Sequence, residues 1–286
     1  MRKQIAFGLA AVLGVAFVGL QDGARVAAQA PVTAPIVFQA AGPNVASIQS
    51  MVDAFRAALG GINNGNVAGP LADGRREINW DGGGSVATSP APTPFDGFLV
   101  NRGGRFTTPG TGFVQAPLDG IATTFANPTY ANIFQAFSPV RLFSAVGSNR
   151  TDTRFFVPGG GELPATTKGF GAVFSDVDTQ VSKAGAPGER LLPTIVWFFG
   201  ANGKLLFRSE VPASQGDASL SFLGVVFDDA RIARVRIRAG SVAPGKDDTA
   251  LRDIVMMDDF IYGEPQAVQG PAALRMLDEA DAEDAQ

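Results

Sequence analysis

Carboxylates are the main chemically active groups that this sequence offers. The chain contains 27 Asp and Glu residues, no histidine and no cysteine. Without imidazole or thiol groups it has no Ser-His-Asp triad, no Cys-His pair and no zinc, copper or iron site built on those ligands. Two kinds of carboxylate chemistry remain. One is a hard-cation site, most naturally for calcium, and the other is an acid/base pair of the kind that glycosidases use.

Two adjacent carboxylates, Asp258 and Asp259, interrupt an apolar segment, residues 254–262 (IVMMDDFIY). Neighbouring side chains of an extended strand point to opposite faces, so one of the two is expected to point inward. A buried charge is costly unless a cation or several hydrogen-bond donors meet it. The pattern leaves two main alternatives open: a calcium ligand, or a carboxylate near a sheet rim that backbone amides or Arg252 satisfy. A catalytic role is a third.

Asn79 and Asp81 offer two more oxygen ligands, two residues apart on one side of an extended segment and just before a glycine loop. They could complete a site with the Asp258 pair if the first and last strands are neighbours, as sandwich topologies often arrange. In that case Asn79, Asp81, Asp258 and Asp259 would form one calcium site. An Asx turn that enters the glycine loop explains Asn79 and Asp81 equally well.

Short β-strands are the elements that must position these side chains. Over residues 77–262, short apolar runs alternate with Asx-Gly and Pro-Gly turns, which is typical of a sandwich or barrel. Residues 194–199 and 204–208 flank Asn202-Gly203, which predicts a hairpin with a tight type I′ turn.

Two further strands can be predicted from their patterns. Residues 219–227 (SLSFLGVVF) are almost continuously apolar, as expected of a strand buried on both faces. In residues 231–240 (RIARVRIRAG) arginines alternate with apolar residues, so Arg234, Arg236 and Arg238 are expected to face outward. This arginine row could bind an acidic polymer, although a solvated strand face is the commoner reason for such a row.

One helix is predicted ahead of these strands. Asn44 can cap it, and apolar residues recur at three- and four-residue spacing from Val45 to Leu59. Gly60-Gly61 then ends it. We expect the helix to cover one end of a β core.

The two ends of the chain are predicted to lie outside the folded domain. Residues 1–28 have the basic, apolar and small-residue order of a secretory signal peptide, with cleavage after Ala28 or Ala30. An uncleaved anchor is the alternative, although the apolar run is shorter than the roughly 20 residues of a spanning helix. Residues 266–286 form an acidic tail that is expected to be flexible. The protein is therefore predicted to be secreted or periplasmic, with no transmembrane anchor after cleavage.

The predicted fold class is all-β. We expect an N-terminal segment, residues 29–69, that carries the short helix, and then a single jelly-roll-like antiparallel β-sandwich over residues 70–265. The formal net charge of the chain is −4, and removal of the signal peptide makes it more negative. Nucleic acid is therefore not an expected partner.

The predicted strands resemble two groups of proteins. Residues 257–262 (MDDFIY) are similar to the last strand of concanavalin-like and MAM-like jelly rolls and of carbohydrate-binding modules. This resemblance implies that an Asp of the strand binds structural calcium together with a residue near the start of the domain. Residues 75–82, 169–174 and 221–225, with the Asp258 strand, resemble a group of uncharacterised secreted bacterial β-sandwich proteins, which implies a fold but no activity.

Three functions are compatible with these features. The first is a calcium-stabilised, non-catalytic protein that binds a polysaccharide or another component of the cell envelope. The second is a carboxylate-dependent carbohydrate-active enzyme, with Glu77, Asp81 and Glu162 as the acid/base candidates. The third is a structural protein of a cell-surface assembly, which would associate with itself.

Overall fold

The computed structural model describes residues 33–84, 87–178, 192–246 and 252–268. The predicted signal peptide and most of the predicted acidic tail lie outside the described residues. Antiparallel strands dominate the described part of the chain, and they form two packed sheets. The predicted all-β sandwich is therefore confirmed, while the strand order does not establish a jelly roll.

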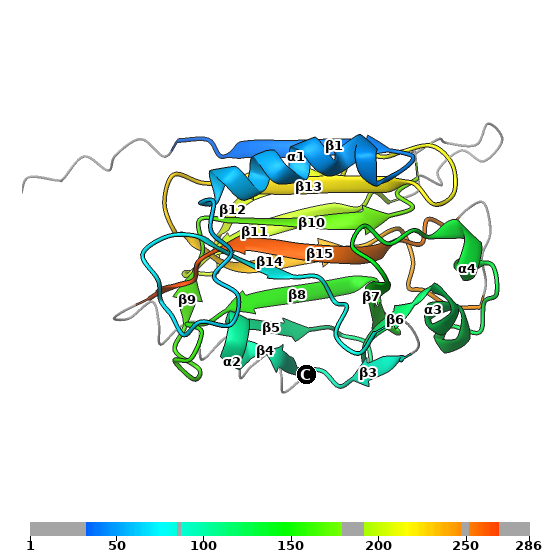
Figure 1. The fold of residues 1–286 in the computed structure, drawn as a ribbon, viewed down its shortest axis with the longest axis horizontal. Coiled ribbons are helices and arrows are strands. Elements are labelled where there is room, and N and C mark those ends of the chain that lie inside the picture. The colour runs from blue at the N-terminus through cyan, green and yellow to red at the C-terminus, as the bar shows by residue number, and fades with distance from the viewer. Residues whose placement is uncertain (1–32, 85–86, 179–191, 247–251, 269–286) are drawn as a thin grey trace, which may run out of the picture. The chain divides into compact units, whose positions relative to one another are not determined.

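Sheet A is the larger of the two sheets (Figure 1). Its strand order is β1-β13-β10-β15-β7-β6-β3, and β2 also pairs with β15. In chain order its strands are β1 (Ile36–Gly42), β2 (Arg75–Ile78), β3 (Ser89–Ala91), β6 (Gly112–Pro117), β7 (Arg141–Val146), β10 (Gly169–Ser175), β13 (Leu220–Val226) and β15 (Met256–Gly263). The pairing of β2 with β15 brings residue 78 opposite residue 260, so the segment of Asn79 begins beside the strand of Asp258.

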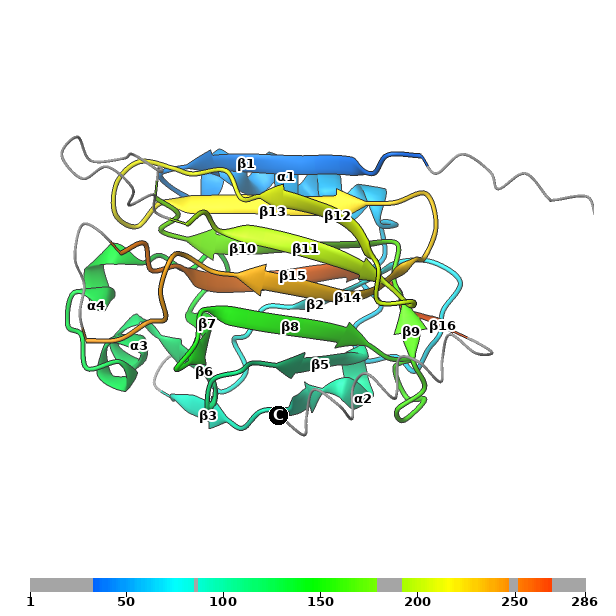
Figure 2. The same cartoon turned by 180° about the vertical axis from the view of Figure 1, so that it is seen from behind.

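Sheet B packs on sheet A and faces the viewer in Figure 2. Its strand order is β12-β11-β14-β8-β5-β4. The bounds are β4 (Phe95–Phe98), β5 (Gly104–Thr107), β8 (Arg150–Phe155), β11 (Ile195–Gly200), β12 (Leu205–Glu210) and β14 (Ile232–Arg238). A small third sheet pairs β9 (Ala165–Thr166) with β16 (Gln266–Ala267).

The space between the sheets is filled mainly by phenylalanine and aliphatic side chains. Trp80, just after β2, is fully buried there and stacks on Phe143 of β7, with ring centroids 3.7 Å apart. In β14, Val235 and Ile237 belong to this core, while the arginines between them face the other way. The predicted alternation of residues 231–240 is thus confirmed. Each aromatic ring buried in this way contributes a large apolar area to stability.

The predicted helix is confirmed as α1 (Val45–Ala58), with Asn44 as its N-cap. The Asn44 carboxamide oxygen accepts a hydrogen bond from Ser47 N at 3.2 Å. The helix lies across the outer face of sheet A, against β1 and β13, and not over one end of the sandwich as expected (Figure 1). Phe55 fits there because Gly224 of β13 has no Cβ, which would lie 2.5 Å from the ring.

Strand β13 is therefore buried on both faces, between the core and α1, as predicted. The remaining helices are short: α2 (Leu99–Arg102), α3 (Leu118–Thr124) and α4 (Tyr130–Ile133). Among the helices in the described ranges, none has the length and apolar character needed to span a membrane.

The hairpin predicted around Asn202-Gly203 forms between β11 and β12, but its turn differs from the prediction. Gly203 N donates to Gly200 O, and Gly200 N donates to Lys204 O. Gly203 has a φ of +70°, whereas Asn202 is not among the residues of positive φ. A type I′ turn needs positive φ at both positions, so the connection is a three-residue loop closed by a left-handed glycine.

Candidate functional site

Asp258 and Asp259 lie at a β-bulge in β15. Asp258 is opposite Val173 of β10, and the register then shifts, so Asp259 is the extra residue, with a φ of +31°. Met257 and Phe260, on either side of the pair, both belong to the core between the sheets. The two carboxylates therefore lie together on the outer side of sheet A. The expectation that adjacent side chains alternate, with one carboxylate pointing into the core, is wrong here because the bulge interrupts the alternation.

Asp258 is fully buried and is held by hydrogen-bond donors. Its Oδ2 accepts hydrogen bonds from the backbone N–H groups of Phe137 at 2.8 Å and Ser138 at 3.2 Å. Its Oδ1 accepts from Asp259 N at 2.8 Å. Burial, followed by the nearby charge of Asp259, raises the pKa of Asp258 well above its usual range, against the opposing effect of the amide donors.

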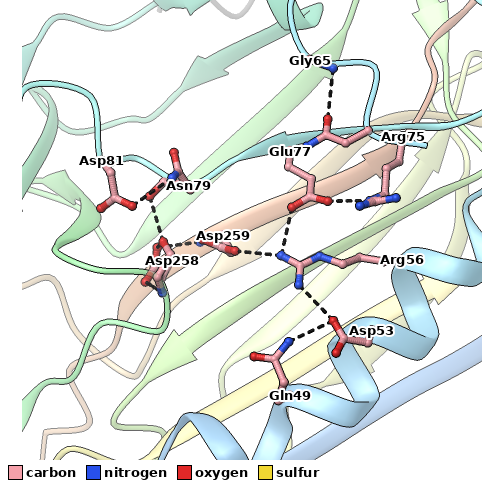
Figure 3. Close-up of polar contacts among 12 residues, drawn as sticks. Gln49, Asp53, Arg56, Gly65, Arg75, Glu77, Asn79, Asp81, Asp258 and Asp259 are labelled. Atoms are coloured by element: carbon pink, nitrogen blue, oxygen red, sulfur yellow. Dashed lines mark hydrogen bonds and ion pairs between the residues drawn. The ribbon is translucent and has the colours of Figure 1, made fainter. Parts of the chain in front are cut away.

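Asp259 turns toward helix α1, where a guanidinium meets it. Arg56 Nη2 lies 3.3 Å from Asp259 Oδ2 and 2.9 Å from Glu77 Oε2 (Figure 3). Glu77 also pairs with Arg75 Nε at 2.5 Å. The other Asp259 oxygen, Oδ1, is buried and has no hydrogen-bond partner among the described residues. Burial raises the pKa of Asp259 to about 6, although the Ser138 hydroxyl and the Arg56 charge act to lower it.

The side chains of Asn79 and Asp81 contact each other, although the segment is not extended as predicted, because Trp80 between them has a φ of +61°. Asn79 Nδ2 donates to Asp81 Oδ2 at 2.9 Å (Figure 3). Asp81 Oδ1 accepts from two successive backbone N–H groups, those of Val140 at 2.6 Å and Arg141 at 3.0 Å. The side chain thus holds the start of β7 against the glycine loop.

The structure brings the predicted metal ligands close to one another, with Ser138 between the backbone of Asn79 and the Asp258 carboxylate. The Ser138 hydroxyl donates to Asn79 O at 3.2 Å and lies 3.4 Å from Asp258 Oδ1. Asp81 is close enough for its charge to raise the pKa of Asp258, after the larger effects of burial and Asp259. Asp259, the fourth, belongs to the group around Arg56.

Backbone N–H donors surround the carboxylates of Asp81 and Asp258, an arrangement that suits hydrogen-bonded carboxylates better than calcium ligands. Calcium needs six to eight oxygen ligands, whereas Asp81 and Asp258 already accept hydrogen bonds from backbone N–H groups. Over the ranges that the structure describes, no three or more Asp, Glu, His or Cys side chains form a group suited to a metal ion. The geometry favours the alternative in which backbone amides satisfy the buried carboxylate. Calcium stays a prediction.

The acid/base candidates of the enzyme hypothesis are divided between the two sheets. Glu77 is held in ion pairs with Arg56 and Arg75, and Asp81 holds backbone amides. Glu162 forms an ion pair with Arg105 of sheet B at 2.8 Å. A glycosidase needs two carboxyl groups that face the same substrate, and these contacts provide no such pair.

A second candidate site lies on the outer face of sheet B, away from the core. Opposed residues of antiparallel strands share a face. Arg236 lies opposite both Asp152 and Trp197, and Arg238 lies opposite Arg150. Arg234 lies opposite Phe199 on β11 and Arg154 on β8. We call this surface the arginine face: Arg150, Asp152, Trp197, Phe199, Arg234, Arg236 and Arg238. It contains a hollow of about 320 Å³, lined by Asn149, Arg150, Trp197, Phe199, Arg236 and Arg238.

A buried carboxylate holds the guanidinium groups of the arginine face in place. Asp152 is 1% exposed, and its Oδ1 accepts from Arg236 Nε at 2.8 Å. Arg234 Nη1 lies 3.3 Å from the same oxygen. Arg150 Nε lies 3.3 Å from Oδ2, an ion pair without hydrogen-bond geometry. One anion thus orients three cations on neighbouring strands.

Aromatic rings support the same guanidinium groups. Arg234 lies over the Phe199 ring, 4.3 Å from its centroid, and Arg238 lies 5.5 Å from the centroid of a Trp197 ring. Arg238 Nη2 also donates to Pro193 O at 3.0 Å. Such cation–π contacts stabilise an arginine without neutralising it.

The sequence revealed only part of the arginine face. The alternation in residues 231–240 identified Arg234, Arg236 and Arg238, but the partners on β8 and β11 could be found only from strand pairing.

Comparisons of the chain with protein-family models, with curated proteins and with solved structures found no match.

Proposed function

We propose that the chain is a non-catalytic binding protein of the extracytoplasmic space, whose arginine face binds a polysaccharide or another component of the cell envelope. The observation that supports it is the hollow where Trp197 and Phe199 lie among Arg150, Arg236 and Arg238. Ligand sites commonly combine apolar or aromatic walls with a few convergent polar groups. Here the rings offer flat surfaces to a sugar, and the guanidinium groups offer hydrogen-bond donors.

The two outer faces of the sandwich differ in a way that supports this assignment. Helix α1 covers the outer face of sheet A, whereas β11, β14 and β8 face outward with no described helix in front of them (Figure 2). The side chains of the arginine face project from paired strands, so their spacing is fixed by the sheet. Sites built on such rigid elements hold their geometry better than sites on loops.

The hollow lacks the groups that hydrolysis of a sugar would need. None of its lining residues is Asp or Glu. Asp152, the nearby carboxylate, is buried beneath the arginines and engaged by them. A retaining or inverting glycosidase uses two carboxyl groups on either side of the scissile bond. Binding without catalysis is therefore the function that this face supports best.

Retention on a panel of immobilised polysaccharides tests the proposal. The wild-type protein is expected to bind at least one of them, and Trp197→Ala is expected to weaken binding by about fivefold or more, as for a central aromatic contact. Val100→Ala is the matched control, because Val100 is an exposed apolar residue of α2 on another part of the surface. If the wild type binds no polysaccharide, or both variants bind like it, the proposal is overturned.

A further inference from the structure

We infer that the ligand of the arginine face is an acidic polysaccharide whose repeating unit carries a carboxylate. This inference rests on the proposed function and narrows its ligand class. It starts from the uneven distribution of charge in the molecule. The chain has a formal net charge of −4, yet the arginine face carries four arginines and one carboxylate, Asp152, which contacts three of them. A patch of positive charge on an acidic protein attracts an anion in preference to a neutral partner.

Two of these arginines have donors that their contacts within the described part of the chain leave unused. The Arg150 side chain is 42% exposed, and its ion pair with Asp152 involves Nε and not the Nη groups. Arg238 uses Nε and Nη2 on a single carbonyl oxygen, that of Pro193. A guanidinium carries five N–H donors, so both residues can donate further hydrogen bonds into the hollow that they line.

The guanidinium groups are held in position before any ligand binds. Asp152 contacts Arg150, Arg234 and Arg236, and the rings of Phe199 and Trp197 support Arg234 and Arg238. Long side chains usually lose conformational entropy when a ligand orders them. Here the fold has already restricted them, so more of the contact energy becomes affinity.

A carboxylate is the anion that this geometry already accommodates. One oxygen of the Asp152 carboxylate contacts the guanidinium groups of both Arg234 and Arg236, which are two residues apart on β14. Guanidinium forks match planar carboxylates, and such charge-assisted bonds are stronger than neutral ones. A uronate placed in the hollow could pair its carboxylate with Arg150 or Arg238 while its ring contacts Trp197. The aromatic rings favour a sugar over a small free anion.

Polygalacturonate and its fully methyl-esterified form are the decisive pair of probes, because esterification removes the charge of each carboxyl group, adds one methyl group there and keeps the same sugar chain. The wild type is expected to bind the free acid about tenfold or more tightly than the ester, and to lose affinity as salt rises. Dextran serves as the neutral polymer and dextran sulfate as the sulfated one. Equal binding of acid and ester, or binding of dextran sulfate without polygalacturonate, overturns the inference but leaves the proposed function standing. If the wild type binds none of these polymers and no polysaccharide of the wider panel, both the inference and the proposed function are overturned.

Three variants locate the interaction. Arg150→Gln and Arg238→Gln are each expected to weaken polygalacturonate binding by about fivefold or more, because each removes one guanidinium from the hollow. Arg238→Lys keeps the positive charge but loses the planar, forked set of guanidinium donors, so this variant is expected to bind polygalacturonate with intermediate affinity. Lys168→Gln is the control, since Lys168 pairs with Asp73 elsewhere on the surface. The melting temperature of each variant is compared with that of the wild type to check that the variant is folded. If all arginine variants bind polygalacturonate as tightly as the wild type, the inference is contradicted.

Discussion

Asp258, Asp259 and Arg141 show three ways of burying a charge in this molecule. Backbone N–H groups meet Asp258, and a guanidinium meets Asp259. Arg141 is a fully buried cation whose guanidinium donates to backbone carbonyl groups of one loop, those of Gly82, Gly84 and Ala87. Hydrogen bonds to charged groups are stronger than those between neutral groups, so backbone groups alone can offset much of the cost of burial.

Arg56 is the residue on which the acidic group around Asp259 depends. Arg56→Gln removes the cation between Glu77 and Asp259 and is expected to lower the free energy of unfolding by about 2–4 kcal/mol, because two largely buried carboxylates lose their partner. Urea denaturation measures the change. Asp53→Asn is the control, since Asp53 is an exposed partner of the same arginine, and we expect a change within about 0.5 kcal/mol. Similar losses in both variants would contradict this role of Arg56.

Asp253 makes stability depend on pH. Burial raises its pKa to about 7, whereas an unfolded Asp titrates near 3.9. Between these values the folded state binds more protons than the unfolded state, so stability falls as pH rises from about 4 to 7. We expect the melting temperature to be higher at pH 5 than at pH 8. Asp253→Asn should reduce this difference and stabilise the protein at pH 8 by about 1–3 kcal/mol. A pH profile identical to that of the wild type would contradict the assignment.

The sequence identified the chemically unusual residues but not their orientation. The adjacent carboxylates in an apolar strand correctly marked a costly site, and backbone amides were among the predicted solutions. The bulge could not be predicted, because it depends on how β15 pairs with β10. Arg56 was missed for a related reason: its partners lie on β2 and β15, far along the chain.

At the scale of elements, the segment between α1 and β2 is held by a buried ion pair. Arg76 of β2 donates from Nε and Nη2 to the two carboxylate oxygens of Glu264, at 2.6 Å each. Arg76 Nη1 donates to Gly65 O and Val67 O, and Glu264 also accepts from Leu71 N. This pair connects the segment to the end of β15.

A double-mutant cycle tests that connection. Arg76→Met should lower the free energy of unfolding by about 3–5 kcal/mol, because it leaves the Glu264 carboxylate buried and unpaired. Arg76→Met combined with Glu264→Leu should lose less than the sum of the two single changes, with a coupling of about 2 kcal/mol. Additive losses in urea denaturation would mean that the two side chains stabilise the fold independently.

Local elements followed from the sequence better than their arrangement did. Helix α1 and the β11–β12 hairpin depend on residues close in the chain, so capping, periodicity and turn residues predicted them. The prediction of a type I′ turn was wrong because, of Asn202 and Gly203, only Gly203 adopts a positive φ. The position of α1 over the face of sheet A depends on Gly224, a contact that no local pattern shows.

At the scale of the whole molecule, the calcium hypothesis can be tested by thermal unfolding. The carboxylates of Asp81 and Asp258 already have hydrogen-bond donors, so we expect calcium to add little. The melting temperature in EDTA and in millimolar calcium should agree within about 1 °C, since a ligand of the native state would raise it. A rise of several degrees in calcium, absent with magnesium, would instead support a calcium site.

The order of the strands has a consequence for how the chain folds. The first described strand, β1, pairs with β13, which places residue 36 opposite residue 226. Strand β2 pairs with β15, which places residue 78 opposite residue 260. Such distant pairings slow folding, because a long loop must close before its contacts form. Sheet A cannot be completed without its central strand β15. A chain truncated before β15 should therefore stay sensitive to protease, and the full chain should become resistant in one step when it refolds from denaturant.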